Sequence, residues 1–235
     1  MEDNQDLVKT YDDINAYGFT DRLKNRVFEK LKEILNRFDK SSLLDVVYTV
    51  VKELIVNATK ALMKRIVFAE NNLDIDDHEE WQKGTAVFKD KLRERFIKEY
   101  VKKSKSLNFK VKIRYIYNKK GMRVEVVNNT PIPKIDEKRL RKELSIAMKY
   151  KSIADYYIDN ADNLEGAGMG LALIIILLMN QGLDPQYLRI GNVGEETIAR
   201  VEIPFTGDYI PYRDQKFKEK FEKEKTSVPV AYDFD

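Results

Sequence analysis

The sequence predicts an α+β fold, in which helices come first and β-hairpins follow. Three helical patterns occupy the first half of the chain: 20–38, 41–68 and 79–103. The period then changes to two, because apolar and polar residues alternate through 107–127 on both sides of a tight turn. A second strand pair is expected within 187–204. Helices and hairpins are therefore segregated, whereas a parallel α/β fold would alternate them.

Composition excludes several classes of protein. The 235 residues are 43% hydrophobic and carry a net charge of +3, which suits one large domain with extensions and disfavours a dedicated nucleic-acid binder. The chain has no cysteine, so disulfides and Cys-ligated zinc are excluded. A single histidine, His78, makes a His-based metal site or a Ser-His-Asp triad untenable. The basic stretch 98–120 is interpreted as solvated helix and strand faces.

The chain has no recognisable targeting or membrane segment. Its first residues are acidic and polar, unlike a signal peptide. The longest apolar run, 171–179, is far shorter than the roughly 20 residues that a membrane span needs. We therefore expect a soluble cytoplasmic protein without a membrane partner.

Possible N-cap residues precede the two main helices. Residues 1–18 are interpreted as a loosely ordered lead-in, after which Thr20 can cap an amphipathic helix. Ser41 or Ser42 can cap the next one, which is apolar almost all round and should be buried.

A glycine-rich stretch, "EGAGMGL", precedes the apolar run. Gly166, Gly168 and Gly170 have the spacing G-x-G-x-G, with no hydrophobic strand before them and no G-K-[ST] after them. Both the dinucleotide fingerprint and the Walker A loop are therefore disfavoured. Glycines let backbone N–H groups approach a phosphate, and a helix N-terminus favours negative charge. A flexible hinge before a core helix is an equally good interpretation of this stretch alone.

The long second helix carries a polar stripe. Glu53, Asn57 and Lys60 lie at i, i+4 and i+7 and so share one face of an otherwise apolar helix. Oxygen donors such as Asn and Glu suit Mg²⁺, Glu can act as a general base, and Lys can meet a phosphate. Taken alone, the stripe is also what a solvated helix face would show.

Together, these motifs resemble the GHKL superfamily, the ATP-binding domains of DNA gyrase, histidine kinases and MutL. The pattern E-L-x-x-N-A-x-K from Glu53 to Lys60 is similar to the family's N box. "GAGMGL" at 166–171 is similar to its G2 box, and "ETIARVEIP" at 196–204 resembles its closing strand. The order of the three motifs also agrees, and the resemblance spans residues 40–205.

The resemblance implies a two-layer α/β sandwich of the Bergerat type, with a mixed, mostly antiparallel sheet covered by helices on one face. It implies that ATP and Mg²⁺ bind between the polar helix, the 128–133 loop and the glycine loop. Asn57 would ligate Mg²⁺, Glu53 would activate water and Lys60 would assist at the phosphates. The remaining implied nucleotide contacts are Asn128, Gly166, Gly168, Met169, Gly170, Leu171 and Thr197.

One motif departs from the family. Asn128 stands where an adenine-reading Asp is expected, and Thr130 stands in place of a glycine of the G1 box. An amide oxygen can still accept a hydrogen bond from an adenine amino group, but it lacks the charge. The alternative is therefore a catalytically degenerate module of the same fold that senses nucleotide or binds a protein.

The resemblance also divides the chain. It implies an N-terminal helical extension at 1–39, a helical insertion at 70–105, an ATP lid at 134–165 and a charged tail at 206–235. Lys60 and the chain length favour the branch of histidine kinases and anti-sigma-factor kinases, which act in signal transduction. If active, the protein would be an ATPase or a kinase of a protein partner in trans. In histidine kinases the helix that carries the phosphoacceptor histidine precedes the N box. His78 follows the N box, so it is interpreted as a surface histidine in a loop.

Overall fold

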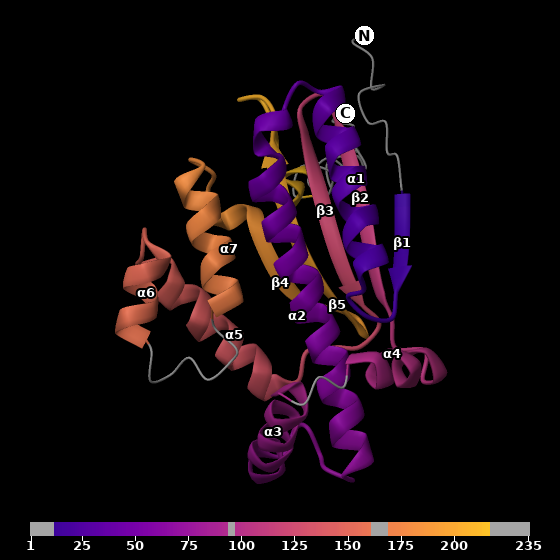
Figure 1. The fold of residues 1–235 in the computed structure, drawn as a ribbon. Helices are drawn as coiled ribbons and strands as arrows, with labels where there is room; N and C mark the ends of the chain where they lie inside the picture. Colours follow the sequence, from indigo (N-terminus) through magenta and orange to yellow (C-terminus); the bar gives the residue numbers. More distant parts are fainter. Residues whose placement is uncertain (1–11, 94–96, 161–168, 217–235) are drawn as a thin grey trace, which may run out of the picture.

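The structure is a computed structural model that describes residues 12–93, 97–160 and 169–216. A sheet is covered on one face by helices, as Figure 1 shows. The helices are α1 Asp21–Arg37, α2 Leu44–Glu70, α3 His78–Arg93, α4 Ile97–Ser106, α5 Lys134–Ala147, α6 Ile153–Asn160 and α7 Met169–Asn180. The strands are β1 Asp12–Ala16, β2 Val111–Asn118, β3 Gly121–Asn128, β4 Leu188–Val193 and β5 Glu196–Pro204.

The described residues form a five-stranded sheet in the order β1-β2-β3-β5-β4, and each neighbouring pair is antiparallel. The β2–β3 hairpin closes through a two-residue turn, since Asn118 pairs with Gly121. The register of β3 on β5 places Asn128 directly opposite Thr197. The predicted α+β class and the two-layer sandwich are confirmed. The sheet was expected to be mixed, but all of its described strand pairs are antiparallel.

Helices α1, α2 and α7 pack on one face of the sheet (Figure 1). Strand β2 shows why, because every second residue from Val111 to Tyr117 is buried against this layer. Helix α7 is apolar on all sides, and its buried residues are Leu171, Ala172, Ile174, Ile175, Ile176 and Leu178. The apolar run after the glycines is thus a core helix, as the sequence predicts.

Three local expectations are wrong. Residues 12–16 are strand β1 rather than a loosely ordered lead-in, because Ile14 and Ala16 share the core. The serines do not cap α2, which begins after a 3₁₀ turn at Ser41–Leu43 without a side-chain cap. His78 is exposed, as expected, but it is the first residue of α3 rather than part of a loop. Thr20 does cap α1, since its hydroxyl accepts from the amide of Leu23.

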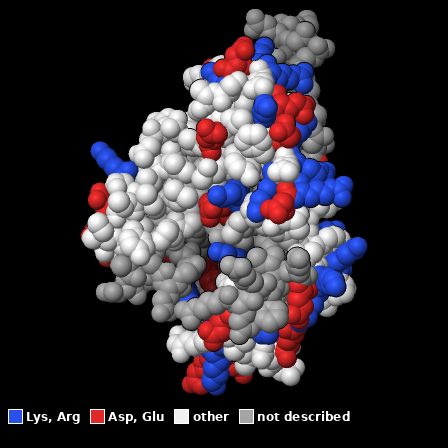
Figure 2. Space-filling view, in the orientation of Figure 1, with Lys and Arg blue, Asp and Glu red and all other residues white. Residues whose placement is uncertain are grey.

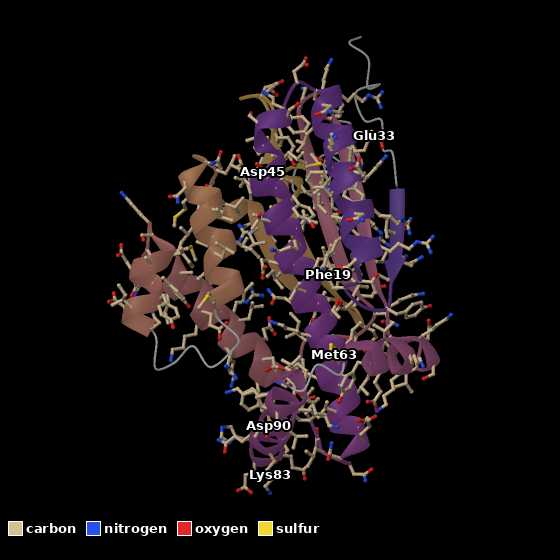
Figure 3. All side chains as sticks on the ribbon, in the orientation of Figure 1. Phe19, Glu33, Asp45, Met63, Lys83 and Asp90 are labelled. Atoms are coloured by element: carbon tan, nitrogen blue, oxygen red, sulfur yellow. The ribbon has the colours of Figure 1, made fainter. Side chains whose placement is uncertain are left out.

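The segment expected as an insertion packs against the second half of α2. Met63, labelled in Figure 3, lies in a small core cluster that joins α2 to Tyr100 of α4. A Cβ at Gly84 would clash with the Phe68 ring, so α3 lies unusually close to α2 at this point. Lys83 and Asp90 are exposed on α3 (Figure 3).

The other two predicted segments are also partly described. Residues 134–160 of the expected lid form α5 and α6, and α5 packs against α7. In the expected tail, the Tyr209 hydroxyl donates to the carboxylate of Glu202 at 2.6 Å. Tyr212 lies under Arg123, whose guanidinium carbon is 3.9 Å from the ring centre. Residues 206–216 thus cover the sheet face opposite the helices.

The surface agrees with the small net charge. Figure 2 shows acidic and basic side chains interspersed on the helical face, with a mostly uncharged area over α6 and α7. Among residues 12–93, 97–160 and 169–216, none of the helices combines the length and apolar character that crossing a bilayer requires.

Strand β1 gives a test of the fold. Ile14 is buried opposite Ile113, whereas the next residue, Asn15, is exposed. Replacing Ile14 with Ala should lower the free energy of unfolding by about 2 to 3 kcal/mol, because it removes buried methyl groups and leaves a cavity. Asn15→Ala is the matched control and should change it by about 0.5 kcal/mol or less. Urea denaturation measures both, and equal stability of the two variants would exclude β1 from the core.

Candidate functional site

The polar stripe of α2 meets the first turn of α7. A Cβ placed on Gly170 would lie 3.0 Å from Glu53 Oε2 and 3.7 Å from Asn57 Oδ1. A larger residue at this position would crowd the Glu53 carboxylate and would touch Asn57 at ordinary van der Waals distance. The two motifs that the sequence singled out separately therefore lie side by side.

Beside this junction is a cavity of about 290 Å³. It is lined by α2, α3, α5, the 128–133 loop, the start of α7 and strands β4 and β5, and it is open to solvent on one side. Five of the predicted site residues line it: Asn57, Lys60, Asn128, Leu171 and Thr197. Its other walls are largely apolar, with Leu54, Ala58, Ala61, Phe88, Leu92, Val126, Pro131, Ile132, Leu140 and Ile190. A concave, largely apolar space with a few converging polar groups is the usual form of a small-molecule site.

Asn128 presents an unused acceptor to the cavity. The residue is 3% exposed, and its Nδ2 donates to the carbonyl of Ala58 at 3.1 Å. This bond fixes the amide, and Oδ1 has no hydrogen-bond partner within the described residues. A buried acceptor left without a partner costs about 1 to 3 kcal/mol, so a ligand that donates to it gains that much.

Asn57 on α2 also has a buried polar atom without a hydrogen-bond partner in the described part of the chain. Its Nδ2 is buried and finds no hydrogen-bond partner among residues 12–93, 97–160 and 169–216. Lys60, one turn further along, makes no ion pair with any residue in the same ranges. The cavity therefore contains polar atoms of three residues whose bonding capacity is unused.

The 128–133 loop is held from two sides. Thr197 Oγ1 donates to the carbonyl of Thr130 at 2.7 Å, and Asn192 Oδ1 accepts from the amide of Ile132 at 2.8 Å. From α2, the Arg65 guanidinium donates to the carbonyl of Pro131. Thr197 thus lines the cavity, and its hydroxyl proton is used to fix the loop.

Sequence reasoning missed a charged cluster at the far end of the cavity. Lys64 Nζ donates to both carboxylate oxygens of Asp136 at 2.8 and 2.9 Å. Trp81 Nε1 donates to the same carboxylate at 3.0 Å, and the Lys64 ammonium lies 4.4 Å from the centre of a Trp81 ring. Burial lowers the pKa of Lys64, and Asp136 partly offsets this. The available signal was position, since Lys64 continues the stripe of Asn57 and Lys60 at i+7 and i+4.

The cavity is electrostatically positive at this end. Lys64, Arg65, Lys89 and Arg139 all line it, against the carboxyl groups of Asp136 and Glu143. Burial raises the pKa of Glu143 and lowers the pKa of Arg65. An electron-rich or anionic ligand is therefore favoured over a cation.

The remaining predicted residues are less completely placed. Glu53 does not line the cavity, and Lys52 Nζ lies 3.6 Å from its Oε1. Met169 begins α7 and is 41% exposed. Gly166 and Gly168 lie outside the described residues. In the described ranges there is no cluster of three or more His, Cys, Asp or Glu side chains that could hold a metal by itself.

Comparison with known proteins gives no family. No protein-family model matches the chain. An uncharacterized protein of Treponema pallidum (strain Nichols) is 30% identical over 173 residues, which are 74% of this chain and 34% of that protein. The chain thus spans about a third of the length of this curated relative.

One solved structure is similar in part. The crystal structure of the SiaB-SiaC complex from Pseudomonas aeruginosa matches 86% of this chain and 92% of the compared chain. The TM-score is 0.42 and the sequence identity is 14%, so the likeness carries no argument about function.

The Lys64–Asp136 pair gives a test of the cluster. Asp136→Asn should lower the free energy of unfolding by about 2 to 3 kcal/mol, because a buried ammonium loses its counter-charge. Asp136 raises the pKa of Lys64, so removing the Asp136 charge in the variant should lower the pKa of Lys64 further below 10.5. Between the two pKa values the unfolded chain binds more protons, so the variant should gain stability as pH rises through this alkaline window.

Denaturation curves from pH 7 to 10.5 measure both effects. Asp21→Asn is the control, because the Lys24–Asp21 pair is solvent-exposed and should contribute no measurable stability. Equal behaviour of the two variants would show that the buried pair is not needed to hold the cavity wall.

Proposed function

We propose that this chain is a Mg-ATP-binding domain of the GHKL type. The carrying observation is the convergence at one cavity of the polar stripe of α2, the first turn of α7 and the unpartnered Asn128 oxygen. The chain order of these three elements is the order that the sequence resemblance implies. The proposal is thus supported by two independent kinds of observation, sequence motifs and their position in the fold.

The phosphate end of the proposed site lies at Asn57. Gly170 brings the first turn of α7 against this side chain, and the N-terminus of α7 supplies amides that favour an anion. Asn57 would contribute an oxygen ligand to Mg²⁺, and Lys60 would meet the phosphates as a point charge. A magnesium ion bound there would neutralise phosphate charge. The unpartnered Asn57 Nδ2 is a donor and would suit a phosphate oxygen, whereas ligation of Mg²⁺ would fall to Oδ1 of the same amide.

The base end lies at Asn128. Its amide is fixed by Ala58, so only an acceptor faces the cavity. Adenine offers an exocyclic amino donor at this edge, whereas guanine offers a carbonyl oxygen that would be repelled. The substitution of Asn for Asp weakens the contact by removing a charge, but it keeps the direction of the hydrogen bond.

The reaction that follows binding depends on Glu53. As a general base, it would deprotonate an attacking water for hydrolysis, or the hydroxyl or imidazole of a protein partner for phosphate transfer. The second candidate is a nucleotide sensor without catalysis. It is favoured by the position of Glu53 outside the cavity lining and by its ion pair with Lys52.

A titration with Mg-ATP tests binding. At a free concentration one hundred times Kd, the ligand should stabilise the fold by about 2.7 kcal/mol, or raise Tm by about 5 to 10 °C. Asn57→Ala should abolish most of the shift, while Asn15→Ala, on the opposite sheet face, should keep it. Fluorescence of Trp81, the single tryptophan, gives a second readout because its indole binds a cavity-lining carboxylate. No shift with the unaltered protein would refute the proposal.

Phosphate release separates the two candidate functions. If Glu53 is the base, Glu53→Gln should lose at least about a hundredfold in the rate of release and keep its affinity for Mg-ATP. Lys52→Gln, at the neighbouring position, is the matched control and should retain most of the rate. Binding without release in the unaltered protein, with and without candidate protein substrates, would identify a sensor.

A further inference from the structure

A second hollow lies between α3 and α5. It has a volume of about 390 Å³, is open to solvent and is lined by residues of α3 and by Arg139 of α5. Three of its lining residues, Thr85, Lys89 and Arg139, also line the cavity of the candidate site. These side chains therefore belong to the wall that separates the two spaces. The proposed nucleotide contacts include none of them.

Thr85 carries an unusual hydroxyl group. In a helix, a threonine hydroxyl commonly bonds to the carbonyl of the residue four positions earlier. Thr49 of α2 does so, with Oγ1 2.8 Å from the carbonyl oxygen of Asp45. The Thr85 Oγ1 is buried and makes no hydrogen bond with any described residue, including the carbonyl of Trp81. A hydroxyl in this state can bond to a ligand in either of the spaces that it lines.

Arg139 is placed over the ring of Trp81. Its guanidinium carbon lies 4.9 Å from the centre of a Trp81 ring, and the Trp81 Nε1 donates to Asp136 at 3.0 Å. The closest oxygen of Glu143 is 3.8 Å from the Arg139 guanidinium, which is longer than a hydrogen bond. The guanidinium therefore has a defined position and keeps N–H donors for a ligand.

The shared wall presents donors rather than acceptors. A guanidinium and an ammonium can only donate, so a hydroxyl beside them is set to donate as well. The carboxylate of Asp136 already accepts from Lys64 and Trp81. Asp90, which also lines the second hollow, is exposed to solvent, and its charge is screened there (Figure 3). Carboxylate or phosphate oxygens fit such a wall, because each of them accepts charge-assisted hydrogen bonds.

This wall lies well beyond the proposed nucleotide along α2. Gly84, the neighbour of Thr85, packs against Phe68 without room for a Cβ. Phe68 is ten residues beyond Ala58, or about 15 Å along the helix. The Ala58 carbonyl holds Asn128, the proposed contact of the base. A ligand at Thr85 is therefore a different molecule from the nucleotide.

We propose that the wall between the two hollows is a second binding site, which takes a small ligand bearing a carboxylate or phosphate group. Thr85 donates its hydroxyl proton to the anionic group, Arg139 donates from its guanidinium, and Lys89 adds positive charge. The helical insertion at 70–105 thereby has a binding role of its own. The site does not depend on the proposed function, since its residues do not contact the proposed nucleotide.

Titration of the full chain with inorganic phosphate and, separately, with glutarate tests the proposal. Trp81 is the single tryptophan and lines the second hollow, so its fluorescence reports binding there, and calorimetry measures Kd. At least one of the two anions should give a saturable change, whereas sodium chloride at the same ionic strength should not. The anion that binds more tightly identifies the class of the anionic group.

Two variants and two controls locate the bound anion. Thr85→Val removes the hydroxyl at nearly constant shape and should weaken binding about 10-fold, and Arg139→Gln should weaken it by about 10-fold or more. Lys83→Gln is the matched control on α3, because Lys83 is exposed and lines neither hollow (Figure 3). Asn57→Ala alters the proposed nucleotide site. Both controls should leave Kd unchanged.

Three results would overturn the second site. They are the absence of a saturable response to both anions, an unchanged Kd in either Thr85→Val or Arg139→Gln, and a loss of binding in Asn57→Ala. The last would place the anion at the proposed phosphate end of the nucleotide site instead. None of the three decides whether Mg-ATP binds, because that is measured by its own titration.

Discussion

The close approach of α7 to α2 at Gly170 is the constraint on which the candidate site depends. A side chain at this position would crowd the Glu53 carboxylate and would pack against Asn57. Because Gly170 lacks one, the first turn of α7 and the polar stripe of α2 share a single location. The apolar remainder of α7 then packs into the core and holds this turn in place. The glycine and the core helix thus act together, one by permitting the contact and the other by fixing it.

Helix α2 carries both apolar residues of the core and polar residues, and the polar ones face the cavity. Val50, Leu54 and Leu62 are fully buried, as the centre of a core requires. Asn57, Lys60 and Lys64 are on the same helix and would each be costly to bury unpaired. Lys64 is stabilised by Asp136, whereas Asn57 keeps an unpartnered amide. A sequence selected for stability alone would not leave a buried amide donor without a hydrogen-bond partner. The unpartnered Nδ2 of Asn57 is therefore an argument for a ligand.

Much of the fold could be predicted from the sequence, because it rests on local periodicity. The alternation in β2 and the all-round apolar character of α7 each have one structural solution. Strand β1 could not be predicted, since its five residues are stabilised by pairing with β2, nearly one hundred positions away. The candidate site likewise contains residues that local motifs indicate and residues that only long-range contacts bring together. Asn57 and Asn128 were predicted as site residues from motifs, whereas the cluster of Lys64 and Trp81 is formed only by their contacts with Asp136, a distant residue.

The 128–133 loop shows how a departure from the expected motif can keep its geometry. The resemblance expects glycines here, and the chain has Thr130, Pro131 and Pro133 instead. The backbone of this loop is nevertheless fixed, by Arg65 from α2 and by Thr197 and Asn192 from the sheet. Proline lowers the entropy that such a loop loses on ordering. Prolines and tertiary hydrogen bonds thus hold this loop, and the Asn128 amide at its start is kept in one position by Ala58.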